Sequence, residues 1–230
     1  MFGLGDMGSG LAKNLIKNGF ETFGYDLLPE RMKDLQVIGG KPARDIADIA
    51  AIVDALFIMV MNGNQVKSIL FGENGLIKLM PPGSAVILTA TIRPKEAHEI
   101  GALMEGSGIH FIDTPVSGGY SGAQDGTLTM MVSAPADILD QFKPVLRAVS
   151  GTIHQVGTAA GMGQTVKACL QTLIGSIFSA TFEASVLAAK AGVDGQALYN
   201  VFSTSGAGCG CTNTALENII AVSYTHLTLP

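Results

Sequence analysis

Short apolar runs alternate along most of the chain with segments whose apolar residues recur at helical spacing. The runs 55–61, 84–89 and 109–113 have the length and continuity of strands covered on both faces. Segments 8–18 and 94–105 have the spacing of helices. This alternation predicts repeated β-α-β units and an α/β, doubly wound fold with a mostly parallel sheet.

Weaker signals add further elements. Residues 21–26 read as a strand, and Pro29 suits the first turn of the helix that follows. Residues 127–132 predict another strand, followed by a helix that opens near Pro135. We expect this α/β domain to cover residues 1–160, with its first strand truncated because only Met1 and Phe2 precede the first glycine.

The pattern changes at residue 163. Residues 163–191 contain no proline and have apolar residues at helical spacing, which predicts a helix roughly 40 Å long. Glu183 and Lys190 interrupt the run of about 20 uncharged residues that a bilayer span needs. We therefore expect a buried core helix, no membrane partner, and the start of an all-α C-terminal domain over 161–221. A further helix is predicted over 194–202, and none after it.

Composition and charge narrow the class of protein. Hydrophobic residues make up 47% of the chain and charged residues 14%, which favours a packed core over disorder. The net charge is −5 and no basic cluster occurs, so nucleic acid is not expected as a partner. Cys169, Cys209 and Cys211 lack metal-ligand spacing, and we expect no metal, a flexible loop at 209–211 and a cytoplasmic location.

A glycine-rich motif opens the chain. The segment Gly3-Leu4-Gly5-Asp6-Met7-Gly8 matches the G-x-G-x-x-G pattern of Rossmann-type dinucleotide-binding folds. Its glycines permit a tight turn, approach of the pyrophosphate, and close packing of helix on strand. Asp26 ends the next strand, where a carboxylate accepts hydrogen bonds from the ribose. This favours NAD, with NADP as the alternative because Arg31 lies nearby; we interpret Arg31 as an exposed helix residue.

At this point the sequence resembles the β-hydroxyacid dehydrogenase family, which includes 3-hydroxyisobutyrate dehydrogenase. The resemblance rests on segments in the family's order over about residues 1–220, and these are Gly3–Asn14, Thr89–Ile92, Asp113–Gly119 and Gly161–Lys167. The resemblance implies an NAD(P)-dependent oxidation of a small hydroxycarboxylate and a homo-oligomer. The segment Pro115-Val-Ser-Gly-Gly119 is the most distinctive of these motifs.

The resemblance also implies roles for individual residues. Ser117, Gly118 and Gly119 follow a strand end and offer a hydroxyl and unobstructed amides to a substrate carboxylate. Thr91 is implied to lie near the nicotinamide. Met61 and Asn62, at the end of another predicted strand, are expected to line the cofactor through backbone groups.

Lys167 is the candidate for the chemical step. It lies in the first turns of the long apolar helix, after glycines that would let a ligand approach. Burial and the nearby nicotinamide charge should lower its pKa, which makes a neutral amine available as general base. Gln171 lies one turn later and is expected to contact the substrate. Much of the family has asparagine there, and glutamine resembles the L-threonate dehydrogenase branch, as does Leu70–Gly75.

Alternatives remain open at this stage. The favoured substrate is L-threonate or a similar four-carbon sugar acid, and 3-hydroxyisobutyrate is the second candidate. A noncatalytic dinucleotide-binding module and an imine-reducing relative are disfavoured by the presence of Lys167. Residues 222–230 have no turn or helix logic connecting them to what precedes, resemble a translated sequencing adapter, and are expected to be a non-native tail. A later family lysine has no counterpart, so the fragment itself is expected to have impaired activity.

Overall fold

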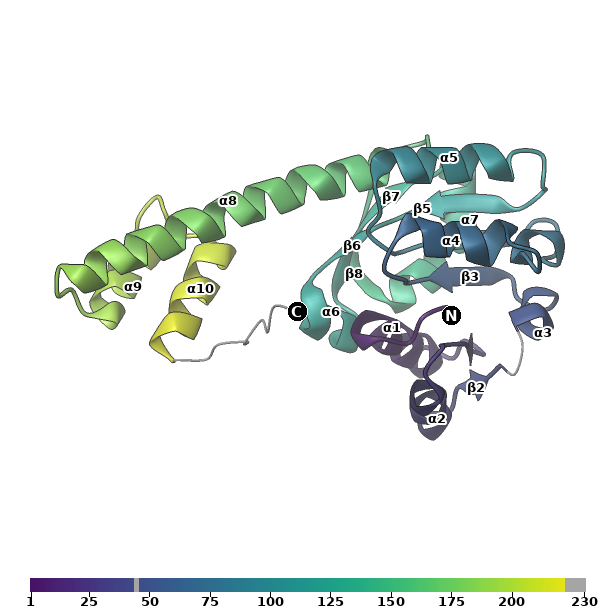
Figure 1. Ribbon diagram of the computed structural model, residues 1–230, viewed down its shortest axis with the longest axis horizontal. Coiled ribbons are helices and arrows are strands. Elements are labelled where there is room, and N and C mark those ends of the chain that lie inside the picture. Colours follow the sequence, from purple (N-terminus) through teal and green to yellow (C-terminus); the bar gives the residue numbers. More distant parts are fainter. Residues whose placement is uncertain (44–45, 222–230) are drawn as a thin grey trace. The chain divides into compact units, whose positions relative to one another are not determined.

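The computed structural model describes residues 1–43 and 46–221, so the expected tail at 222–230 lies outside the described residues. The chain divides into two compact units, the first over Met1–Lys167 and the second from Ala168 onward (Figure 1). The helices of the first unit, in chain order, are α1 (Asp6–Lys17), α2 (Pro29–Val37), α3 (Ile46–Ala50), α4 (Gly63–Phe71), the 3-10 helix η1 (Leu76–Lys78), α5 (Pro94–Met104), α6 (Gly119–Asp125) and α7 (Ala136–Ala148).

The described strands of the first unit form a six-stranded mixed sheet and a separate two-stranded sheet of β1 (Phe23–Gly24) and β2 (Lys41–Pro42). The strands of the six-stranded main sheet are β3 (Ala55–Ile58), β4 (Ala85–Leu88), β5 (His110–Asp113), β6 (Val116–Ser117), β7 (Leu128–Ser133) and β8 (Ser150–Gly157). Within the described residues the main sheet has the order β3-β4-β5-β7-β6, with β8 paired to β7. Strands β3, β4 and β5 are parallel, whereas β7 runs antiparallel to β5 and β6.

The segment before the glycine loop is connected to the strands beside it through isolated bridges. Phe2 forms parallel bridges with both Tyr25 and Ile58, and β1 pairs in parallel with β2. The segment before the glycine loop therefore lies between the β1 side and the edge strand β3. This arrangement and the helices on both faces confirm the predicted Rossmann-type fold with a mostly parallel sheet, followed by a helical region.

Side chains that alternate along each central strand fill two separate cores. Phe57 and Ile87 belong to the core that α1 and α7 cover, through residues such as Leu11 and Leu146. Their strand neighbours form the other core, which α4 and α5 cover; its strand residues are Leu56, Ile58, Val86 and Leu88. Every position of β4 is buried, as expected for a strand covered on both faces. Burial on two faces explains why the strands read as continuous apolar runs.

The second unit is helical. The long helix α8 (Met162–Lys190) begins in the first unit, and α9 (Gly195–Thr204) and α10 (Gly210–Ile220) follow. Asp194 caps α9 by accepting hydrogen bonds from the amides of Gln196 and Ala197. By length and composition α8 meets the criteria for a membrane span, and only 6% of its most apolar window is buried in the chain. The expectation of a buried core helix is therefore wrong for the described residues.

Most predicted elements exist, with shifted boundaries. The predicted strand 21–26 is reduced to β1, because only Phe23 and Gly24 form a continuous ladder, with β2, while Tyr25 forms an isolated bridge with Phe2. Helix α10 was not predicted, and the glycines at 206, 208 and 210 explain why. The interpretation of Cys209–Cys211 as a loop is wrong, since Cys209 is the N-cap of α10 and the two residues after it are helical.

Candidate active site

The glycine motif forms the turn between Phe2 and α1. Gly3 has a φ of 83°, and its amide donates to the carbonyl of Tyr25. A Cβ on Gly8 would lie 1.9 Å from the carbonyl oxygen of Gly3, so only glycine allows the helix to pack this closely on the turn. Beside Gly5, the nearest atoms to such a Cβ would be those of the Arg31 guanidinium, 3.6 Å away or more. The backbone at Gly5 is thus accessible, as approach of a pyrophosphate requires.

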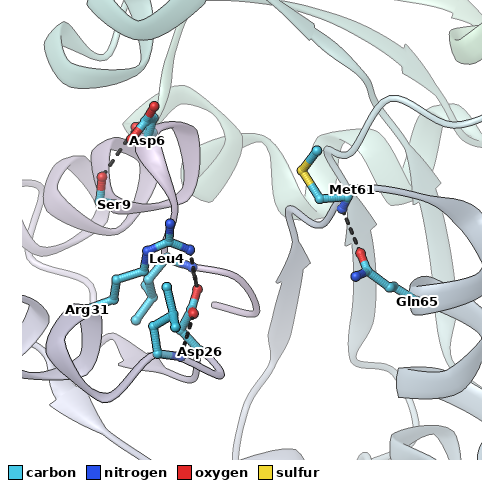
Figure 2. A network of polar contacts seen from close by, with 8 residues as sticks. Leu4, Asp6, Ser9, Asp26, Arg31, Met61 and Gln65 are labelled. Carbon is cyan, nitrogen blue, oxygen red and sulfur yellow. Dashed lines mark hydrogen bonds and ion pairs between the residues drawn. The ribbon is translucent and has the colours of Figure 1, made fainter. Parts of the chain in front are cut away.

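Asp26 connects the glycine turn to the start of α2 (Figure 2). Its Oδ2 accepts a hydrogen bond from the Leu4 amide at 2.7 Å, and its Oδ1 accepts one from the Leu28 amide at 2.9 Å. Arg31 also pairs with Oδ2 at 3.3 Å, so it is more than an exposed helix residue. Burial opposes ionisation of Asp26, but these hydrogen bonds outweigh it and lower the pKa of the carboxyl.

Met61 and Asn62, the two residues predicted to line the cofactor, follow the end of β3. The Met61 amide donates to Oε1 of Gln65 at 2.8 Å, while the Met61 side chain is 83% exposed (Figure 2). Asn62 caps α4, and its Oδ1 accepts from the Gln65 amide at 2.9 Å. Met61 and Asn62 therefore lie at a strand-to-helix turn at the carboxyl edge of the sheet, beside the glycine turn, because Gly3 packs against the backbone of Met59.

The turn formed by Ser117, Gly118 and Gly119 is connected to α1, the helix that follows the glycine motif. Ser117 ends β6, and Gly118 and Gly119, both with positive φ, lead into α6. Helices α6 and α1 lie side by side (Figure 1), and Asn14 Nδ2 on α1 donates to the carbonyl of Ala123 at 2.8 Å. Helix α1 thus begins in the glycine motif and contacts the helix that follows Ser117.

A buried amide–carboxylate pair joins the ends of β4 and β5 to the start of α8. Asp113, the last residue of β5, accepts hydrogen bonds from the Gly161 amide at 2.9 Å and from Gln164 Nε2 at 2.9 Å. Gln164 also bonds to the backbone of Ala90 and Ile92, the two neighbours of Thr91. The side chain of Thr91 is exposed at this same edge.

Lys167 lies one turn after Gln164 on α8. It is 8% exposed, and burial lowers the pKa of its amine from the usual lysine value. The start of its helix packs close to the segment that leads to Ser117, since a Cβ on Gly163 would lie 3.0 Å from Pro115 Cδ. Gln171 lies four residues further on, in the part of α8 that belongs to the second unit, and it is exposed.

Comparisons with known proteins agree with this geometry. Residues 1–157 match the model of the NAD-binding domain of 6-phosphogluconate dehydrogenase, and residues 161–226 match that of the NAD-binding domain of NADP-dependent 3-hydroxyisobutyrate dehydrogenase. This chain belongs to the β-hydroxyacid dehydrogenase family of NAD(P)-dependent enzymes. The predicted cofactor, NAD with NADP as an alternative, agrees with these matches.

Relatives of this dehydrogenase cover nearly all of its length. An L-threonate dehydrogenase of Cupriavidus necator is 36% identical over 99% of the chain and 76% of the relative. The structure of a 3-hydroxyisobutyrate dehydrogenase of Salmonella typhimurium is 35% identical, with a TM-score of 0.85 over 97% of the chain and 78% of that protein. A Mycobacterium tuberculosis 3-hydroxyisobutyrate dehydrogenase studied with L-serine is 31% identical, with a TM-score of 0.85 over 93% and 72%.

Sequence reasoning missed three polar residues of the dehydrogenase that organise this edge. Asn14, Asp113 and Gln164 all lie within the family motifs, yet none was given a role of its own. A signal existed for Asp113, because a carboxylate that directly ends a buried strand needs hydrogen-bond donors. The partners of Asn14 and Gln164 are up to 110 residues away in sequence, which no local pattern reports.

A cavity of the dehydrogenase lies outside this site. This cavity, of about 550 Å³, opens at the opposite edge of the sheet, where Ala55 begins β3 and Ser84 directly precedes β4. Over residues 1–43 and 46–221 there is no cluster of three or more His, Cys, Asp or Glu side chains suited to a metal.

Proposed function

We propose that the chain oxidises a small hydroxy acid with NAD, with Lys167 as the general base and L-threonate or a similar four-carbon sugar acid as substrate. The observation that carries the proposal is the burial of the Lys167 amine at the carboxyl edge that also holds the glycine turn and Ser117. Because burial lowers the pKa of this amine, a larger fraction of it is neutral at working pH than for a surface lysine.

Each proposed role follows from the position of the residue. The amides of the glycine turn receive the pyrophosphate, and Asp26 receives the ribose hydroxyls. Ser117, Gly118 and Gly119 bind the substrate carboxylate, with Gln171 contributing to substrate binding. Lys167 removes the proton from the substrate hydroxyl and returns it in the reverse direction. Bound NAD⁺ would supply the hydride acceptor for the carbon that carries this hydroxyl.

The substrate proposal has two lines of support. The Cupriavidus necator relative named an L-threonate dehydrogenase matches almost the whole chain, and Gln171 is the residue expected of that branch. The second candidate is 3-hydroxyisobutyrate, favoured by the two similar structures that carry that name. A hydroxylated four-carbon acid offers more hydrogen-bonding groups to the Gln171 amide than 3-hydroxyisobutyrate does.

The preference for NAD over NADP depends on Asp26 and Arg31. A carboxylate at this position repels a 2′-phosphate, and three protein donors already hold Asp26 in its ionised form. Arg31 is bound to Asp26, which reduces its availability for a phosphate. We propose further that the domain boundary lies near residue 160, that the protein is cytoplasmic, and that it forms a homo-oligomer.

The test is the reduction of NAD⁺, followed by absorbance, with L-threonate, other aldonates and 3-hydroxyisobutyrate. Lys167→Ala should lower kcat by about 10²- to 10⁴-fold, because a positioned general base contributes that much. Lys143→Ala is the matched control, since Lys143 is a partly exposed lysine on α7 paired with Asp140. Binding of NADH should remain in both variants.

The outcomes separate the candidate functions. Turnover that persists undiminished in Lys167→Ala removes this residue from the mechanism. Tight binding of NADH without turnover of any hydroxy acid favours a noncatalytic dinucleotide-binding module. A higher kcat/KM for 3-hydroxyisobutyrate than for L-threonate selects the second substrate.

A further inference from the structure

Gln164 uses all the hydrogen-bonding capacity of its amide nitrogen within the protein. Its Nε2 donates to the carbonyl of Ala90 at 3.0 Å and to Asp113 Oδ1 at 2.9 Å. Its Oε1 accepts from the Ile92 amide at 3.0 Å. The side chain is 1% exposed, so water does not compete for these bonds. One glutamine thus fixes the backbone on both sides of Thr91.

Asp113 fixes the other side of the same junction. Its Oδ2 accepts from the amides of Gly161 and Gln164, at 2.9 and 3.4 Å, in the turn that begins α8. The residue is fully buried. Burial raises the pKa of its carboxyl, and the bonds from Gln164 and Gly161 oppose that rise. Because all of these partners are N–H donors, the arrangement suits the ionised carboxylate.

The backbone at the first turn of α8 is also closely packed against the strands beside it. A Cβ on Gly163 would lie 2.6 Å from the Met131 carbonyl oxygen and 2.9 Å from that of Asp113. The first turn of α8 is therefore seated against β5 and β7. Lys167 comes three residues after Gln164, on the same side of the helix, so any movement of this turn moves the lysine.

We propose that Asp113 and Gln164 are positioning residues that hold Lys167 and Thr91 in a fixed relation at the carboxyl edge of the sheet. This inference rests on the proposed function, in which Lys167 removes the substrate proton and Thr91 lies beside the nicotinamide. The two residues act through backbone and helix, and neither needs to touch the substrate. A glutamine is required because its amide both donates and accepts, whereas glutamate lacks the donors and methionine lacks both.

The experiment measures Lys167 directly and needs no turnover. Amines of the 230-residue chain are acetylated with trace acetic anhydride at a series of pH values, and the modification of each lysine is read by peptide mass spectrometry. In the unaltered chain Lys167 should show a titration midpoint below the ordinary lysine value of 10.5. In Gln164→Met the midpoint should rise by about one pH unit, since the loosened helix turn rehydrates the amine.

Two further variants complete the design. Gln155→Met is the matched control, because Gln155 Nε2 makes the same kind of bond, to the Ala134 carbonyl at 2.9 Å, and should leave the Lys167 midpoint unchanged. Gln164→Leu loses the acceptor for the Ile92 amide and both donated bonds without adding a charge near Lys167, so it should shift the midpoint in the same direction as Gln164→Met. It also serves if Gln164→Met does not fold, as judged by its thermal transition.

The results distinguish this inference from the proposed function. An unchanged Lys167 midpoint in either folded Gln164 variant overturns the positioning role, whatever the activity is. Labelling of Lys167 with a midpoint at the ordinary lysine value of 10.5 in the unaltered chain overturns it as well. Full turnover in Lys167→Ala, together with the expected shifts, would instead remove the catalytic role and leave a structural contact.

Discussion

The two units of this chain use apolar residues in opposite ways. In Met1–Lys167 the apolar residues of the strands are buried in two cores, one on each face of the sheet. From Ala168 onward, Ala215 and Leu216 are the buried hydrophobic residues among those described, while Phe182, Val186 and Leu187 are exposed. Apolar composition therefore shows which surfaces are hydrophobic. Whether such a surface is buried depends on the neighbouring segments that the fold places against it.

The largest expected effect tests this contrast with one substitution in each unit. Leu88→Ala removes a fully buried side chain of β4 and should lower the free energy of unfolding by about 2–5 kcal/mol. Leu187→Ala removes a side chain that is 71% exposed on α8 and should change it by less than about 0.5 kcal/mol. Urea unfolding followed by circular dichroism measures both. Similar losses in the two variants would mean that α8 is covered in solution.

A second comparison uses two aspartates that accept backbone amides. Asp26 is buried and bonds to the amides of Leu4 and Leu28, whereas Asp194 caps α9 in an exposed position. Asp26→Ala should cost about 3 kcal/mol because it leaves the buried Leu4 amide and the part-buried Leu28 amide unpaired. The partly exposed Arg31 contact adds little. Asp194→Ala should cost about 1 kcal/mol. Equal losses in urea unfolding would contradict the idea that burial sets the difference.

The smallest expected effect is the pH dependence of the Asp26 contribution. The folded protein lowers the pKa of Asp26 below its ordinary value of 3.8. A carboxyl with a depressed folded pKa stabilises the fold above its unfolded pKa, and that contribution is lost as the pH falls through the folded pKa. The stability difference between the unaltered chain and Asp26→Asn should therefore be greatest near neutral pH and shrink below about pH 4. A difference that stays constant over this range would show that Asp26 does not titrate as inferred.

Local patterns were sufficient for the elements that alternate regularly. The runs around Phe57 and Ile87 predicted buried strands because each residue meets a core on its own face of the sheet. The strand at 21–26 was predicted too long, because β2 pairs with Phe23 and Gly24 alone and Phe2 adds only an isolated bridge to Tyr25. Helix α10 was missed because glycines mask its beginning, even though its interior residues Ala215 and Leu216 are buried.

The candidate site was foreseen in part. The glycine motif, Asp26 and the turn at Ser117 each carry a local signature, so their positions at strand ends followed from the sequence. The roles of Asn14 and Gln164 did not follow, because an amide in a helix is locally ordinary. Only the packing of α6 on α1, and of α8 on the ends of β4 and β5, gives these amides their partners.

The sequence by itself determined the doubly wound α/β class and the position of the glycine-rich turn, since these depend on spacing and residue chemistry along the chain, and its family motifs made Lys167 the candidate base. The tertiary structure decided the antiparallel placement of β7, the exposure of α8 and the buried pair that seats its first turn. The physical reason is that burial and hydrogen bonding between distant segments depend on which surfaces meet. A linear pattern shows which side of an element is apolar. Which segment packs against that side depends on the order of the strands and on the packing of the helices.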